Sequence, residues 1–118
     1  MWEVITTDVF VKWFRQQSPA LKEDVLAILK ILREEGPQLG RPFADTVKGS
    51  NYPNMKELRI QHQGNPVRVF YAFDPKRNGI VLCAGDKIGL NEKQFYKDMI
   101  KIADEVFSTH LNSLNEDK

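Results

Sequence analysis

The sequence predicts an α+β domain, and two patterns lead to that prediction. Apolar residues recur at helical spacing near both ends of the chain, whereas the middle alternates in the manner of β-strands between turn signals. A length of 118 residues with 42% hydrophobic and 28% charged residues is ordinary for one globular domain. We therefore expect a single domain over residues 1–118 with the element order β, α, α, β, β, β, α.

The first third of the chain predicts a strand followed by a helical hairpin. Alternation over residues 2–5 suits a short strand. Thr7 or Asp8 can then cap a helix with apolar residues at helical spacing. A second helix is expected to begin after Ser18 and to stop at Gly36, because serine is a frequent N-cap and glycine commonly ends a helix.

The rest of the chain predicts a loop, three strands and a long final helix. Residues 38–54 contain two glycines and two prolines and are expected to form a loop. Gln63-Gly64-Asn65 is expected to connect a hairpin, Asn91 to cap the last helix, and the polar residues 112–118 to fray. The three strands are expected over residues 55–62, 66–74 and 80–84.

Composition excludes several classes of site. A single cysteine, Cys83, excludes a disulfide within the chain, and it lies in an apolar strand where a small hydrophobic role is favoured over a nucleophile. His62 and His110 lack metal-ligand spacing, and no phosphate-binding loop is present. We expect no metal, no cofactor, no membrane span and, without a secretory signal, a cytoplasmic location.

Charge is unevenly distributed along a chain that is almost neutral. The whole chain carries 17 basic and 16 acidic residues, but residues 41–101 carry 11 basic and 6 acidic ones. A basic middle region can attract a polyanion locally, although charges can also segregate this way by chance.

Two arginines are predicted to share one face of the sheet. Strand alternation places Arg59 and Arg68 on the face opposite the apolar core, on neighbouring antiparallel strands. Lys87 follows the third strand of this region, Lys48 precedes the first, and Lys56 lies near the start of the first. Helices would then cover one face while the other carries a cationic patch.

This face has two interpretations. The patch can be a platform for a polyanion such as nucleic acid. Alternatively, Arg59 pairs with Glu57 or Asp74 and the charges simply solvate an open sheet face. The residues alone favour the second interpretation.

Six short segments, taken together in their order and spacing, resemble the HigB-type, phage-associated branch of the RelE/ParE toxin superfamily. They are LGRP (39–42), VKGS (47–50), KELR (56–59), RVFYAFDP (68–75), GDK (85–87) and FY (95–96). The resemblance implies a small antiparallel sheet with an N-terminal helical hairpin and a C-terminal helix. It further implies the toxin of a type II toxin–antitoxin pair, acting as a ribosome-dependent mRNA endonuclease without a cofactor.

That implied reaction assigns roles to five residues. Attack by an RNA 2′-hydroxyl needs charge stabilisation and two proton transfers. Arginine stays protonated, so Arg59 and Arg68 are assigned to the phosphate. Lys87 and Lys56 are candidates for proton transfer or for charge neutralisation, since lysine becomes a base only when its pKa is lowered. Tyr96 is a candidate for acid–base chemistry, for stacking on a base or for packing.

Further contacts and partners also follow from the resemblance. Arg41, Lys48 and Arg77 are assigned to the RNA or ribosomal backbone. The expected partners are the ribosome, mRNA and a cognate helix-turn-helix antitoxin of HigA type. The chain departs from some relatives because Asp86 and Lys87, and no histidine, follow the last strand. The alternatives are a ParE-like toxin that binds and poisons DNA gyrase, and a decayed phage protein that retains only antitoxin binding.

Overall fold

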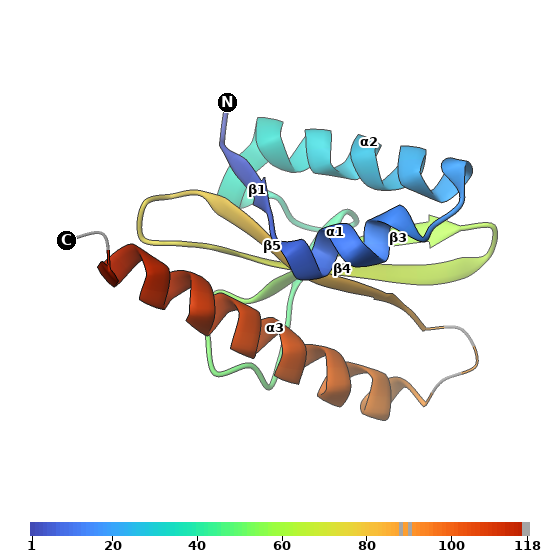
Figure 1. Ribbon diagram of the computed structural model, residues 1–118. Coiled ribbons are helices and arrows are strands. Elements are labelled where there is room, and N and C mark those ends of the chain that lie inside the picture. The colour runs from blue at the N-terminus through green and yellow to red at the C-terminus, as the bar shows by residue number, and fades with distance from the viewer. Residues whose placement is uncertain (88, 90, 117–118) are drawn as a thin grey trace.

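The structure, a computed structural model, describes residues 1–87, 89 and 91–116. It confirms the α+β class (Figure 1). One element goes beyond the predicted order: a short strand lies inside the predicted loop, following a single 3₁₀ turn at Gly36–Gln38. The elements are β1 (Val4–Thr6), α1 (Asp8–Arg15), α2 (Pro19–Glu35), β2 (Ala44–Thr46), β3 (Lys56–His62), β4 (Asn65–Phe73), β5 (Gly79–Asp86) and α3 (Glu92–Glu116).

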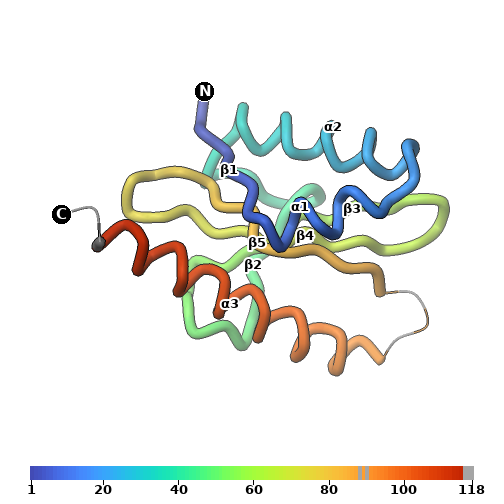
Figure 2. Tube along the Cα trace, in the orientation of Figure 1, coloured from blue at the N-terminus to red at the C-terminus, as the bar shows by residue number. Residues whose placement is uncertain are grey.

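The strands form one five-stranded sheet in the order β1-β5-β4-β3-β2. β1 pairs with β5 in parallel, and the other neighbours are antiparallel. The chain therefore enters at one edge of the sheet, crosses through α1 and α2, and returns at the opposite edge, as the trace in Figure 2 shows. β4 lies in the centre, with both faces available for packing.

Helices cover both faces of this sheet, so the prediction of an open cationic face is wrong. α1 and α2 lie over one face and α3 lies over the other (Figure 1). The reason is that β4 and β5 are apolar on both sides. Val69 and Tyr71 pack in the core under α1 and α2, whereas Phe70 and Ala72 pack in the core under α3. A strand with two apolar faces needs a cover on each.

The predicted helix caps are confirmed. The Thr7 hydroxyl accepts a hydrogen bond from the backbone N–H of Phe10 at 3.3 Å, and that of Ser18 accepts one from Leu21 at 3.2 Å. The Asn91 side chain caps α3 in the same way. α3 then continues through residue 116, into the segment expected to fray. None of the helices in the described part of the chain is long and apolar enough to cross a membrane.

A tight hairpin sets the register of β3 against β4. Gln63 and Gly64 have φ values of 50° and 81°, as in a two-residue turn whose twist matches that of the strands. This turn places Arg59 directly opposite Arg68.

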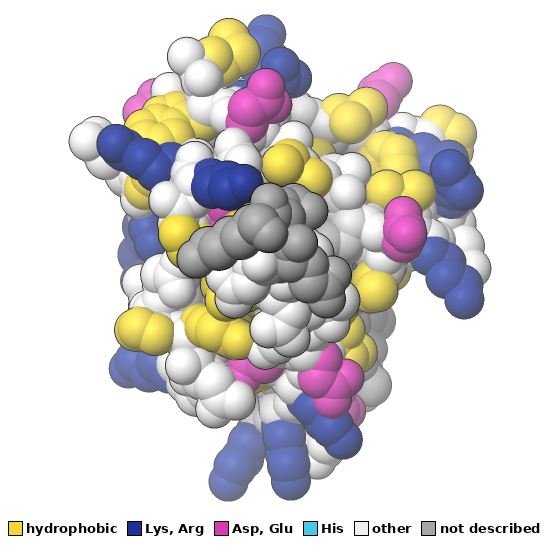
Figure 3. All heavy atoms as spheres, turned by 60° about the vertical axis from the view of Figure 1, so that its left-hand side comes forward, with side chains coloured by type: hydrophobic (Ala, Val, Ile, Leu, Met, Phe, Trp, Pro, Cys, Tyr) yellow, Lys and Arg dark blue, Asp and Glu magenta, His cyan; other side chains and the backbone are white. Residues whose placement is uncertain are grey.

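The surface mixes charged and apolar groups. In the view of Figure 3, lysine and arginine side chains project along the lower edge of the molecule, and hydrophobic side chains are scattered among polar ones above them. Among the residues that the structure describes, the most exposed large hydrophobic residue after Met1 is Leu26.

Candidate functional site

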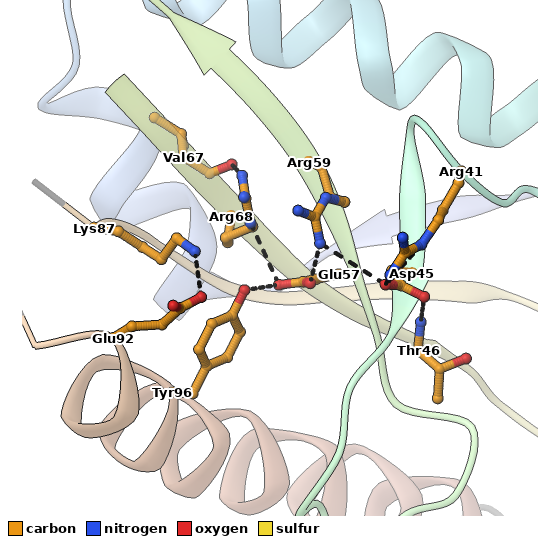
Figure 4. Close-up of polar contacts among 10 residues, drawn as sticks. All are labelled: Arg41, Asp45, Thr46, Glu57, Arg59, Val67, Arg68, Lys87, Glu92 and Tyr96. Carbon is orange, nitrogen blue, oxygen red and sulfur yellow. Dashed lines mark hydrogen bonds and ion pairs between the residues drawn. The ribbon is translucent and has the colours of Figure 1, made fainter. Parts of the chain in front are cut away.

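A buried glutamate lies at the centre of the cationic cluster. Glu57 on β3 is only 4% exposed, and Figure 4 shows its carboxylate between the side chains of Arg59, Arg68 and Tyr96. The Tyr96 hydroxyl donates to Glu57 Oε1 at 2.6 Å, and Arg59 Nη1 donates to Oε2 at 3.1 Å. Arg68 Nε lies 3.6 Å from Oε1, an ion-pair distance. Three groups from three elements therefore converge on one carboxylate.

Strand pairing explains why this carboxylate is needed. Two arginines directly opposite each other on neighbouring strands repel. Glu57 shares the face of Arg59, two residues earlier on the same strand, and therefore lies within reach of both guanidinium groups. Arg68 is 6% exposed and also donates to the carbonyl of Val67 at 3.1 Å.

Close packing of α3 brings the tyrosine to this cluster. Gly85 on β5 is the strand partner of Arg68. A Cβ atom at Gly85 would lie 3.1 Å from the ring of Phe95 and 3.2 Å from the sulfur of Met99. The missing side chain lets the first turns of α3 approach the sheet, which places Tyr96 beside Glu57.

A second carboxylate extends the cluster toward β2. Asp45 Oδ2 accepts hydrogen bonds from Arg41 Nε and Nη2 at 3.1 and 2.6 Å, and lies 3.8 Å from Arg59 Nη1. The hydrogen bond from Arg41, followed by one from the Thr46 backbone, lowers the pKa of Asp45. Asp45 therefore links Arg41, which is exposed, to the half-buried Arg59.

Lys87 closes the cluster on the other side. Its ammonium lies 3.0 Å from Glu92 Oε1 and 5.1 Å from the centre of the Tyr96 ring. The hydrogen bond from Lys87 lowers the pKa of Glu92. The Lys87 side chain is only 13% exposed, so the ammonium is held against the aromatic ring.

Tyr96 is a phenol that keeps its proton at neutral pH. Burial, followed by the hydrogen bond to Glu57, raises the pKa of Tyr96 to about 12, although Arg68 acts in the opposite direction. The hydroxyl is consequently a hydrogen-bond donor and a potential proton donor.

The structure brings together four of the five predicted catalytic residues and separates the fifth. Arg59 and Arg68 lie on the face of the sheet that α3 covers, and Tyr96 from α3 and Lys87 after β5 adjoin them there. Lys56 points to the other face, where its ammonium donates to the carbonyl of Pro37 at 2.9 Å.

The three residues assigned to the RNA backbone lie in three different places. Arg41 joins the cluster through Asp45. Lys48 lines a groove between the loop after β2 and α3, which Tyr96 also lines. Arg77 lies in the turn between β4 and β5, stacked 4.8 Å from the ring centre of Trp2, at the end of β4 opposite to Arg68.

Sequence reasoning missed the carboxylates. Glu57 was predicted only as a surface partner for Arg59, and no role was predicted for Asp45 or Glu92. A signal was available for Glu57, because it alternates with Leu58 onto the same face as Arg59. Among residues 1–87, 89 and 91–116, no group of three or more His, Cys, Asp or Glu side chains is arranged to hold a metal ion.

The cluster is chemically suited to a phosphodiester. Four cations, Arg41, Arg59, Arg68 and Lys87, face three carboxylates, so an anionic group can take over guanidinium donors that the carboxylates already orient. Arg59 is 36% exposed and is therefore open to a ligand. Arg68 lies beneath it as a buried charge.

The fold defines the class of protein first. The chain is similar to a mutant of the E. coli toxin RelE in the free state, with a TM-score of 0.60 and 14% identity over 86% of this chain and 93% of that one. The isolated E. coli RelE toxin gives a TM-score of 0.58 at 15% identity over 86% and 97% of the two chains. A chain of the intact E. coli RelBE toxin–antitoxin complex gives 0.54 at 15% identity over 72% and 95%. The molecule therefore has the RelE-like fold.

The family follows from the sequence itself. Residues 12–108 match the model of the phage-derived Gp49-like proteins, and the chain belongs to this family. It is 46% identical over 107 residues to a Mycobacterium tuberculosis protein that carries the toxin name HigB2, over 90% of this chain and 53% of that protein. It is 43% identical over 94 residues to one named HigB3 from the same organism, over 80% of each. The chain thus spans about half the length of HigB2 and most of HigB3.

Proposed function

We propose that this chain is the toxin of a type II toxin–antitoxin pair and that it cleaves mRNA on the ribosome. The relatives named as HigB toxins and the RelE-like fold support the toxin assignment. The single observation that carries the nuclease assignment is the convergence of Arg59, Arg68 and Tyr96 on Glu57. Two guanidinium groups and a phenol held on one carboxylate are the donors that phosphodiester cleavage requires.

The two arginines stabilise the phosphate during the reaction. Attack of the 2′-oxygen on the neighbouring phosphorus adds negative charge to the phosphoryl oxygens. Arg59, which is half-exposed, contacts these oxygens directly, and the buried Arg68 supports them from below. A preorganised donor of this kind contributes about 100-fold or more to the rate.

Glu57 and Tyr96 can carry out the two proton transfers of the reaction. When the substrate phosphate takes over Arg59, the freed Glu57 carboxylate accepts the proton of the 2′-hydroxyl as the P–O2′ bond forms. The P–O5′ bond breaks, and the Tyr96 phenol gives its proton to the leaving 5′-oxygen. The hydrogen bond between Tyr96 and Glu57, at 2.6 Å, then returns the proton from the carboxylic acid to the phenolate. Lys87 neutralises charge beside the ring.

This scheme is tested in a reconstituted translation system with mRNA 5′ ends mapped by primer extension. Arg59→Ala and Tyr96→Phe are each expected to lower cleavage at least about 100-fold while the protein stays folded. Arg15→Ala is the matched control, because Arg15 is exposed at the end of α1, over the opposite face. Cleavage by both variants at the wild-type rate would refute the scheme. Intact mRNA in the presence of a wild-type protein that still arrests growth would point to gyrase or another target that is not cleaved.

A cognate antitoxin is the proposed partner. The solved RelBE complex pairs a toxin of this fold with its antitoxin. For this chain we propose a helix-turn-helix antitoxin of HigA type that silences the cationic cluster, since acidic groups would compete for Arg41 and Arg59. Co-expression with the product of a neighbouring open reading frame, followed by purification at high salt, tests for a stable complex. Free toxin after co-expression would contradict the pairing.

A further inference from the structure

A second cationic feature adjoins the site but lies outside it. A groove of about 440 Å³ runs between the loop after β2 and the first half of α3. It is lined by Lys48, Gly49, Lys93, Tyr96, Lys97 and Ile100. Three lysines therefore surround a partly apolar floor, and Tyr96 forms a wall shared with the candidate site.

The lysines of this groove have no counter-ion among the residues that the structure describes. Lys48, Lys93 and Lys97 are all exposed, and none forms an ion pair or side-chain hydrogen bond with any residue in the described ranges 1–87, 89 and 91–116. By contrast, Arg41, Arg59, Arg68 and Lys87 are each matched with a carboxylate. The groove consequently holds the uncompensated positive charge next to the site.

The placement of two of these lysines is unfavourable for the helix that carries them. Lys93 lies in the first turn of α3, where the helix dipole disfavours a cation. Lys93 and Lys97 are also separated by four residues on the same face, an arrangement in which like charges destabilise a helix by a few tenths of a kcal/mol. Fold stability therefore does not explain these charges, whereas an anionic ligand does.

We propose that this groove binds the phosphodiester backbone of the substrate RNA strand on one side of the scissile phosphate. The proposal rests on the proposed nuclease function and extends it to the path of the substrate. Tyr96 connects the two regions, because its hydroxyl contacts Glu57 while its side chain lines the groove. Lys93 and Lys97 contact successive phosphates along α3, and Lys48 contacts the strand from the other wall. The strand thus leaves the arginine cluster past Tyr96 and follows α3.

Salt dependence of RNA binding tests this path separately from cleavage. The probe is a fluorescent single-stranded 2′-O-methyl RNA of twelve nucleotides, which lacks the attacking hydroxyl and cannot be cut by the proposed reaction. Its dissociation constant is measured by anisotropy at several KCl concentrations for the full chain and for Lys93→Ala/Lys97→Ala. The matched control is Lys12→Ala/Lys30→Ala, which removes two exposed lysines from α1 and α2 on the opposite side of the sheet.

The expected result is a change in slope. Each phosphate contact on a single strand contributes about −0.7 to the slope of log K against log salt, so the Lys93→Ala/Lys97→Ala slope should be shallower than wild type by about 1.4. The control variant should keep the wild-type slope. An equal loss of slope in both variants would show a diffuse charge effect and would refute RNA binding in the groove. Failure of the wild-type chain to bind this RNA would refute it as well. A loss of slope confined to Lys93→Ala/Lys97→Ala, in a protein that cleaves no mRNA, would support RNA binding in the groove and refute the proposed nuclease function.

Discussion

Replacing Glu57 by glutamine removes one negative charge from the centre of the cationic cluster with almost no change in shape. Arg68 then becomes a buried guanidinium without a carboxylate, since both side chains are nearly inaccessible, at 7% and 5% exposure. The glutamine amide oxygen can still accept the hydrogen bond from Tyr96. The substitution therefore isolates the electrostatic part of the contact.

The magnitude follows from these contacts. Removing one partner of a buried ion pair destabilises a protein by about 3–5 kcal/mol. The separation of 3.6 Å between Arg68 Nε and the carboxylate favours the lower end of that range. The contact with Arg59 adds little, because that side chain is 36% exposed and solvent screens it. We expect a loss of about 3 kcal/mol in the free energy of unfolding for Glu57→Gln, a large part of the 5–15 kcal/mol typical of a domain.

Urea unfolding followed by circular dichroism measures this loss. With a denaturant dependence of about 1.5 kcal/mol per molar urea, the midpoint should fall by about 2 M. The control is Glu92→Gln, which removes a carboxylate that is 72% exposed from its pair with Lys87 and should move the midpoint by less than about 0.5 M. A Glu57→Gln midpoint as close to wild type as that of the control would refute the argument that Glu57 is needed to hold a buried arginine.

Three further outcomes are expected. Tyr96 has a folded-state pKa of about 12, above its unfolded value near 10, so its contribution to stability is complete below pH 10 and is lost as the pH rises toward 12. The urea midpoints of wild type and Tyr96→Phe should therefore converge between pH 10 and pH 12. A constant difference between the two midpoints would contradict the raised pKa of Tyr96. Burial raises the pKa of the Cys83 thiol to about 12, so a thiol reagent at pH 7.5 should label the protein only after denaturation, and immediate labelling of native protein would contradict the buried position. Gly36→Ala should lower the thermal midpoint by several degrees more than Gly64→Ala. Both glycines have positive φ, but a Cβ atom would lie 2.4 Å from the Trp2 ring at Gly36 and would meet nothing at Gly64. Equal shifts in the two midpoints would show that backbone strain alone acts.

The pairing of the two arginines could be predicted from the sequence because it depends on short-range rules. Strand alternation assigned the faces, and the Gln63-Gly64 turn fixed the register that sets Arg59 opposite Arg68. The same rule excludes Lys56 from the site, since it shares the parity of Leu58 and therefore the opposite face. Lys56 was assigned to the reaction from the family resemblance, whereas the strand alternation predicts that its side chain lies on the opposite face.

The position of Tyr96 depends on packing that no local pattern encodes. Tyr96 reaches Glu57 because α3 lies across the second face of the sheet, and the apolar residues on both sides of β4 require that cover. β2 was missed for a similar reason. Its three residues, Ala44–Thr46, are too few to give a strand period, and they become a strand only by pairing with β3.

The chemistry of cleavage is the most direct test of the central claim that this arginine–glutamate–tyrosine cluster cleaves RNA through the 2′-oxygen. The measurement uses a message that carries 2′-deoxyribose at the nucleotide preceding a mapped cut, compared with the all-ribose message in the same translation system. We predict that cleavage disappears at the modified position and continues elsewhere. Persistent cleavage at the deoxyribonucleotide would contradict the proposed reaction, because the attacking group would then be something other than the neighbouring 2′-hydroxyl.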